Sequence, residues 1–226
     1  CGEACRTAAT MMYHATFCGR DLSEINGVVS KAYMGADKNL LIMMKMVGIT
    51  VQNRRHLGHQ FLFEEPVEQY PWQILLRQSD CRGGEPVPLD ELQRERWAMV
   101  CKVYSNDTLC IDPRFDFEHY LEIESTIRMN AMGMSARSLE DEDVVGRIGA
   151  LAITASLVNH ACEGNAYGPF SDVDRDCLRI NFTAARDLKK GEELVFSYVN
   201  PETPYAVRQE YIKNHYGFTC TCPKCV

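Results

Sequence analysis

The sequence predicts an α+β protein in which a mostly helical first part precedes a part built of short β-strands. Three observations support this class. Residues 27–135 carry apolar side chains at the spacing of amphipathic helices. From Ala136 onward apolar and polar residues alternate, which is typical of half-buried strands. The chain then ends in a Cys-x-Cys-x-x-Cys motif, a spacing that suits a tetrahedral zinc ion better than disulfides.

The composition is that of a globular protein, with 46% hydrophobic and 24% charged residues among 226. A formal net charge of −7 argues against direct nucleic-acid binding and suits a basic partner, such as a lysine-bearing peptide. No apolar run is long enough to span a bilayer, so no membrane contact is expected. Short cysteine spacings indicate reduced thiols, hence a cytoplasmic or nuclear location. We expect a monomer.

The first 26 residues are predicted to form a helical, zinc-binding segment. Cys1 and Cys5 are four residues apart, and so are His14 and Cys18. Residues at this spacing share one face of a helix, so each pair can offer two ligands to a metal. A structural zinc ion needs four ligands. The residues alone leave open one shared site, two separate sites, or no metal.

Three helices are predicted in the region that follows. The first contains an apolar stripe, formed by Leu40, Leu41, Met43, Met44 and Val47. The second opens at Asp90, after a loop at residues 83–88, and runs to about Val103. The third extends from about Asp116 to Arg128, and Asn130 then begins more extended structure.

The last part is predicted to hold two strands and a helix. Leu178, Ile180 and Phe182 alternate with polar residues and therefore form one face of a strand. After a turn at residues 189–191, Leu194, Phe196 and Tyr198 share one face of the next strand. Thr203 is a suitable N-cap and Pro204 a suitable first residue for a helix that leads to the cysteine tail.

Three motifs occur in a fixed order in the last third of the chain. They are Asn159-His160-Ala161-Cys162, then Gly191-Glu192-Glu193-Leu194-Val195-Phe196-Ser197-Tyr198, then Cys220-Thr221-Cys222-Pro223-Lys224-Cys225. Together they resemble the SET-domain protein lysine methyltransferases, and the resemblance is strong from about Met129 to Cys225. It implies a SET fold of small twisted β-sheets, with a knot-like C-terminus, a helical insertion and a zinc-binding post-SET tail.

The resemblance also implies an activity and its residues. The activity is S-adenosylmethionine-dependent N-methylation of a lysine in a protein or peptide substrate, histone or otherwise. The implied cofactor-binding residues are Asn130, Asn159, His160, Tyr198 and Phe218. Tyr198 and Tyr216 are implied to be catalytic, lining the lysine channel. Cys162, Cys220, Cys222 and Cys225 are implied to bind one zinc ion.

Residues 1–18 resemble the second half of a MYND zinc finger, which indicates the SET-and-MYND branch. In that family Cys1 and Cys5 would bind one zinc, and His14 and Cys18 another. The implied domains are a finger remnant at residues 1–26, a helical SET insertion at 27–128, the SET core at 129–219 and the tail at 220–226. The family's glycine-rich first SET strand is missing here. We therefore expect a truncated chain, of low activity by itself.

The sequence departs from the family at one motif. The usual Asn-His-Ser-Cys-x-Pro-Asn reads Asn-His-Ala-Cys-Glu-Gly-Asn over residues 159–165, and loss of the proline is expected to loosen this loop. The departure keeps open an alternative function, a catalytically weak SET-like module that binds other proteins. A zinc hydrolase is disfavoured because a catalytic zinc keeps one coordination position open, whereas these cysteine sites are ligand-complete.

Overall fold

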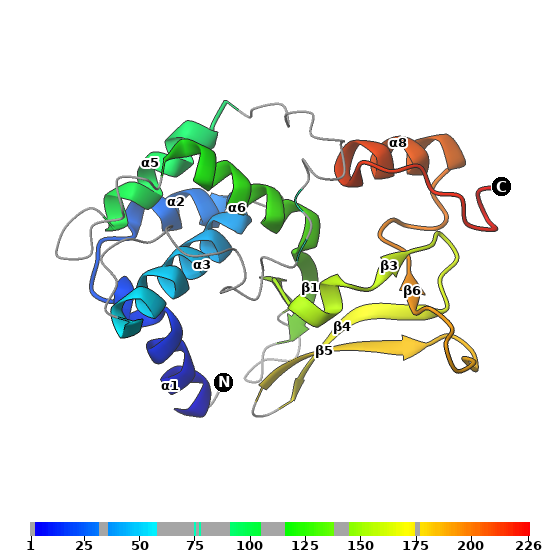
Figure 1. Ribbon diagram of the computed structural model, residues 1–226, viewed down its shortest axis with the longest axis horizontal. Coiled ribbons are helices and arrows are strands. Elements are labelled where there is room, and N and C mark those ends of the chain that lie inside the picture. Colours follow the sequence, from blue (N-terminus) through cyan, green and yellow to red (C-terminus); the bar gives the residue numbers. More distant parts are fainter. Residues whose placement is uncertain are drawn as a thin grey trace. The chain divides into compact units, whose positions relative to one another are not determined.

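The computed structural model describes residues 3–31, 36–57, 75, 77, 91–104, 116–137, 145–174 and 177–226. Two compact units are present. The described residues up to Arg128 form the first unit, and those from Met129 onward form the second (Figure 1). The loop expected at residues 83–88 lies outside the described residues.

The first unit is helical, as predicted. Its elements are α1 (Glu3–Met12), the 3₁₀ turn η1 (His14–Thr16), α2 (Ser23–Lys31), α3 (Ala36–Leu57), α5 (Gln93–Tyr104) and α6 (Phe117–Asn130). The predicted stripe on α3 is largely buried, because Leu40, Met43, Met44 and Val47 are each at most 3% exposed. Leu41 differs, since its side chain is 39% exposed.

A close contact involving a helix glycine organises this core. Tyr104 is fully buried, and its hydroxyl donates a hydrogen bond to the Met44 carbonyl at 2.7 Å. A Cβ atom added to Gly48 would lie 2.9 Å from Thr16 Oγ1 and 3.1 Å from the Tyr104 hydroxyl oxygen. The missing side chain therefore lets η1 and α5 approach α3 closely.

The second unit contains three two-stranded sheets. In the first, β1 (Met132–Arg137) pairs with β2 (Val145–Ala150) antiparallel; in the second, β4 (Ala166–Asp174) pairs with β5 (Cys177–Ala184), also antiparallel. In the third, β3 (Asn159–His160) pairs with β6 (Val195–Phe196) parallel. With α7 (Ile153–Ser156) and α8 (Tyr205–Tyr216), these small sheets confirm the predicted α+β class.

Three local predictions need correction. Asn130, expected to begin extended structure, is the last residue of α6, and β1 begins only at Met132. The expected strand through Leu194 and Tyr198 pairs over only two residues, Val195 and Phe196. The N-cap residue of α8 is Pro204, one residue after the expected Thr203. Pro204 has the extended ψ of 144°, and no side-chain hydrogen bond caps the helix.

The C-terminal tail turns back along α8 (Figure 1). Gly217 ends the helix in the left-handed conformation, with φ of 76°, which glycine adopts without strain. The Gln209 side chain then bonds both backbone groups of Cys220, at 2.7 and 3.0 Å. This pair of bonds fixes the tail against the helix.

Among the described helices, none combines the length and apolar character that crossing a membrane requires.

The packing around Gly48 leads to a test of the first unit. We expect Gly48→Ala to lower the free energy of unfolding by about 1–2 kcal/mol, because overpacking outweighs the gain in helix propensity. Gly27 on α2 is the matched control, since a Cβ added there meets no atom within 4 Å. Gly27→Ala should raise stability by up to about 1 kcal/mol. Urea unfolding followed by circular dichroism measures both, and effects of the same sign would contradict the packing argument.

Candidate active site and cysteine cluster

Four cysteines far apart in the sequence meet in the second unit. The sulfur atoms of Cys162, Cys220, Cys222 and Cys225 all lie within 4.8 Å of one another. Cys162 Sγ is 3.4 Å from Cys225 Sγ and 3.9 Å from Cys220 Sγ. Tetrahedral zinc with Zn–S bonds of about 2.3 Å needs sulfurs separated by about 3.8 Å. The donor set and its spacing therefore fit one zinc ion.

The protein holds this cluster against an apolar core. Cys162 and Cys220 are buried together with Ile212 of α8, and Val199 packs against them. Burial raises the pKa of the Cys162 thiol to about 12, because the thiolate loses its hydration. A bound zinc would favour the thiolate instead, and this exchange of protons for metal is how such sites couple to folding.

Arg208 is a residue to which the sequence assigned no role. It lies on α8, only 5% exposed, and its guanidinium is 3.7 Å from Cys225 Sγ. The same group donates a short hydrogen bond to the Thr203 carbonyl. A cation placed here favours the thiolate forms of the cluster. The sequence could have indicated this role, because Arg208 is four residues before Ile212 and therefore shares the apolar face of the helix.

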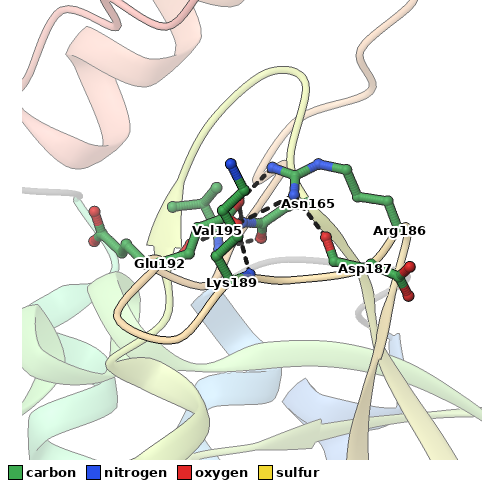
Figure 2. Close-up of polar contacts among 7 residues, drawn as sticks. Asn165, Arg186, Asp187, Lys189, Glu192 and Val195 are labelled. Atoms are coloured by element: carbon green, nitrogen blue, oxygen red, sulfur yellow. Dashed lines mark hydrogen bonds and ion pairs between the residues drawn. The ribbon is translucent and has the colours of Figure 1, made fainter.

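A buried asparagine ties the loop after β3 to the strand β6 (Figure 2). Asn165 Nδ2 donates to Glu192 Oε1 at 3.1 Å and to the Glu193 carbonyl at 2.8 Å, while Asn165 Oδ1 accepts from Val195 N at 2.9 Å. Its backbone N–H donates to the Val195 carbonyl. Asn165 thus uses its amide on both sides to hold the two segments in register.

Glu192 is itself fixed from several directions (Figure 2). Arg186 forms an ion pair with both of its carboxylate oxygens, and Lys189 N donates to Oε2 at 3.1 Å. The Arg186 side chain and these hydrogen bonds lower the pKa of Glu192 to about 2. The carboxylate is therefore ionised at neutral pH and remains a hydrogen-bond acceptor only.

The loop is closely packed at the glycine that replaces the family's proline. A Cβ atom added to Gly164 would lie 2.6 Å from the Val195 carbonyl oxygen and 2.7 Å from Phe196 Cα. The loop backbone therefore rests directly on β6. Together with the bonds of Asn165, this contact holds the loop against β6, and the loosening expected from loss of the proline stays a prediction.

A cavity of about 210 Å³ opens beside β6. Its lining comprises Met129, Asn130, Ala131, Met132, Gly133, Ala155, Ser156, Val158, Gly168, Phe196, Ser197, Tyr198 and Tyr216. Pockets for drug-sized ligands occupy roughly 300–1,000 Å³. This smaller cavity suits a single side chain better than a whole nucleoside cofactor. The methionines and glycines of its wall carried no signal in the sequence that separated them from core residues.

Tyr198 and Tyr216 lie side by side in this cavity, with ring centroids 4.8 Å apart. The Tyr198 hydroxyl donates to the Val158 carbonyl at 2.7 Å. Burial, with a further contribution from the Glu193 charge, raises the pKa of Tyr198 to about 12. Burial also raises the pKa of Tyr216. Both rings therefore stay neutral phenols near neutral pH.

Asn159 lies on the exposed side of β3, outside the lining of the cavity. Its Nδ2 donates to Glu193 Oε1 at 2.6 Å. A carboxylate only accepts hydrogen bonds, so the amide nitrogen must face Glu193, and Asn159 Oδ1 is left for another donor. Glu193 belongs to a motif quoted above, but no role was predicted for its side chain.

His160 follows Asn159 and points toward both the cysteines and Tyr198. Its ring centroid is 5.0 Å from that of Tyr198 and 6.0 Å from that of Phe218. Burial, and then the nearby Arg208 charge, lowers the pKa of His160 to about 4. The imidazole is therefore neutral at physiological pH. Phe218 is 38% exposed and lies outside the cavity lining, as His160 does.

The N-terminal ligands predicted from the sequence are only partly described. Cys1 and the side chain of Cys5 lie outside the described residues. His14 and Cys18 are both exposed, and Cys18 N donates to the His14 carbonyl across one turn. Within the described residues, the cluster of Cys162 and the tail is the one group with three or more potential metal ligands. Zinc at the N-terminus stays a prediction.

Several curated proteins are similar to this chain. One is histone-lysine N-methyltransferase SET5 of Scheffersomyces stipitis, with 40% identity over 73 residues, 32% of this chain and 15% of that protein. Another is histone-lysine N-methyltransferase ATXR2 of Arabidopsis thaliana, with 39% identity over 71 residues, 31% of this chain and 15% of that protein. A SET and MYND domain-containing protein of Dictyostelium discoideum is 23% identical over 120 residues, 50% of this chain and 33% of that protein.

The similarity to these proteins thus covers a third or less of their length. The match to a whole protein family covers more of this chain than the match to any of these three proteins. The SET domain family matches residues 26–199, which is more than half of this sequence. The chain therefore belongs to the SET domain family.

Proposed function

We propose that the protein is an S-adenosylmethionine-dependent protein-lysine N-methyltransferase. The observation that carries the proposal is the small cavity in which Tyr198 and Tyr216 stand side by side, within a chain of the SET domain family. Two similar proteins bear the name histone-lysine N-methyltransferase, which supports the reaction class. The substrate is then a lysine-bearing protein or peptide.

Asn159, His160 and Asn130 are proposed to bind the cofactor. S-adenosylmethionine supplies a methyl group activated on a sulfonium, which an amine attacks with its lone pair while the carbon–sulfur bond breaks. Asn159 fits this ligand because its side chain is exposed and its Oδ1 can accept from an ammonium group. Asn130 lines the cavity itself. Phe218 is proposed to cover the bound cofactor.

Tyr198 is proposed to orient the substrate amine. Its hydroxyl proton is committed to the Val158 carbonyl, so the phenol oxygen keeps lone pairs for an N–H of the amine. Because the phenol stays protonated, it acts as a hydrogen-bonding group and not as a general base. The apolar walls at Met132 and Phe196 disfavour an ammonium ion, which promotes loss of its proton to water before transfer. Alignment and electrostatics then supply the rate enhancement.

We propose one zinc ion in the cluster of Cys162, Cys220, Cys222 and Cys225. It would supply structural rather than chemical function, because four thiolates complete its coordination. The tail that carries three of these cysteines follows directly on Tyr216. Zinc there would therefore hold α8 and Tyr216 in place beside the cavity.

The finer family branch is also a proposal. The name of the Dictyostelium relative supports the SET-and-MYND branch. Residues 1–26 would then be the remnant of a zinc finger, with Cys1, Cys5, His14 and Cys18 as its zinc ligands. A helical insertion at 27–128, a core at 129–219 and a tail at 220–226 would follow. The family match begins at residue 26 and runs through the helical region, as an insertion within the domain requires. We propose nuclear or cytoplasmic action as a monomer.

The role of Tyr198 is testable by removing one atom. We expect Tyr198→Phe to slow methyl transfer by roughly 10- to 1,000-fold, as for loss of a positioned hydrogen-bonding group. Cofactor affinity should stay within about two-fold, because the hydroxyl serves the amine and not the cofactor. Transfer of labelled methyl to a lysine-rich peptide and calorimetry with S-adenosylhomocysteine are the measurements.

The control is Tyr205→Phe on the exposed face of α8, where the side chain is 53% accessible. Turnover equal in Tyr198→Phe and wild type would remove Tyr198 from the mechanism. Absence of methyl transfer by the full-length protein to any lysine-bearing substrate would instead favour the SET-like interaction module.

The zinc site is testable by metal content. We expect Cys162→Ser to lose one zinc equivalent relative to the wild type, because a structural site needs all four ligands. Limited proteolysis should then cut the tail faster. X-ray absorption of the wild type should give Zn–S distances of about 2.3 Å. Cys101→Ser on α5, outside the cluster, is the control. Retention of the full metal content by Cys162→Ser would eliminate this site.

A further inference from the structure

We propose that the His160 imidazole links the cysteine cluster to Tyr198, so that loading the cluster with zinc fixes Tyr198 in the cavity. His160 is in this sense a positioning residue. The inference rests on the proposed zinc site and adds a side-chain role for His160 that is separate from contacts to the cofactor.

Both ring nitrogens of His160 have a partner. Nδ1 lies 2.9 Å from the backbone nitrogen of Tyr198, and Nε2 lies 3.3 Å from Cys162 Sγ. A backbone N–H can only donate, so Nδ1 must be the acceptor. In the neutral ring the proton then resides on Nε2, which donates toward the sulfur. One tautomer therefore satisfies both contacts.

The backbone of Tyr198 depends on this contact because the strand has already ended. The ladder between β3 and β6 stops at the pair His160–Phe196, two residues before Tyr198. The amide of Tyr198 bonds to an imidazole instead of a neighbouring strand. A shift of this ring would therefore move the backbone that carries the Tyr198 side chain.

The metal changes the strength of the other contact. A thiol sulfur is a weak hydrogen-bond acceptor, whereas a thiolate accepts a stronger, charge-assisted bond. Zinc makes the Cys162 sulfur a thiolate, so loading strengthens the bond from His160 Nε2. Groups that bond to metal ligands commonly orient them and change metal affinity by about 10- to 100-fold. Here the same ring also holds Tyr198.

Two substitutions separate the two contacts. The side chain of His160→Asn can place its amide oxygen near the former Nδ1, where it accepts from Tyr198, but it is too short to reach Cys162. The longer side chain of His160→Gln can place its amide nitrogen near the former Nε2 and keep the bond to sulfur, while the acceptor for Tyr198 is lost. His119→Gln, on α6, is the control for the residue type.

The main readout is hydrogen exchange of backbone amides by NMR, in protein stripped of metal and reloaded with zinc chloride. In the wild type, zinc should slow exchange of the Tyr198 amide by at least about 10-fold, which corresponds to about 1.4 kcal/mol. The Ala185 amide, which donates to the Asn165 carbonyl, should change far less. This comparison needs no mutant and no methyl transfer.

The variants should dissociate the two effects. In His160→Gln the Tyr198 amide should lose its protection, kcat should fall more than KM changes, and zinc release to a chelator should stay within about two-fold of wild type. In His160→Asn zinc release should accelerate by about 10-fold or more. In both variants the protection of Tyr198 should no longer respond to zinc.

Three outcomes would overturn the proposal. The first is equal protection of the Tyr198 amide with and without zinc, and the second is zinc-dependent protection that persists in both variants. The third is equal loss of protection at the Ala185 and Tyr198 amides when zinc is removed, which would mean that zinc stabilises the whole unit. If the Tyr198 amide follows zinc but no methyl transfer is found, the link through His160 stands and the proposed enzymatic function fails.

Discussion

A parallel pairing of only two residues on each strand is the constraint on which the second unit depends. β3 and β6 join segments 36 positions apart, as the pairs Asn159–Val195 and His160–Phe196 show. So short a ladder supplies few backbone hydrogen bonds, and each is worth only about 1 kcal/mol net. The side-chain amide of Asn165 and the cysteine cluster extend this pairing on either side. Phe196, the last paired residue of β6, and Tyr198, two residues later, both line the cavity.

Burial determines the charge states of the titratable side chains around the cavity. Burial keeps Tyr198 a phenol and His160 an uncharged imidazole. Arg208 is the buried cation next to the sulfurs. Four thiolates around the proposed Zn²⁺ would carry a net charge of −2, which the nearby guanidinium would partly offset. Zinc loading would therefore gain from Arg208, whereas a cluster of neutral thiols gains little.

The sequence predicted the fold class because apolar periodicity is a local pattern, and the family resemblance implied the grouping of the four cysteines. The helices at α3, α5 and α6 and the strand β5 follow from apolar periodicity. The zinc ligands were implied by a family resemblance, and the structure brings their sulfurs together. The sequence does not reveal the two contacts of His160, because these contacts depend on where the fold places Cys162 and Tyr198 around its ring.

Other parts of the site carry no pattern that sequence analysis can detect. Met129 and Met132 line the cavity, but such residues are common in any core. The bond between Asn159 and Glu193 joins residues in two different motifs, and neither motif alone implies it. The cap of α8 shifted by one residue because proline accepts both the extended and the helical ψ at a helix start.

The packing of Gly164 bears on whether the altered motif weakens the site. The family's proline would stiffen a loop by restricting its unfolded state, so its loss alone predicts a looser loop. In this chain the glycine instead lets the loop backbone rest on β6, where a Cβ would approach Val195 O to 2.6 Å. Close backbone contact and the bonds of Asn165 thus replace a restriction built into the residue itself. The loop with the altered motif is therefore held in place by contacts other than those that a proline would make.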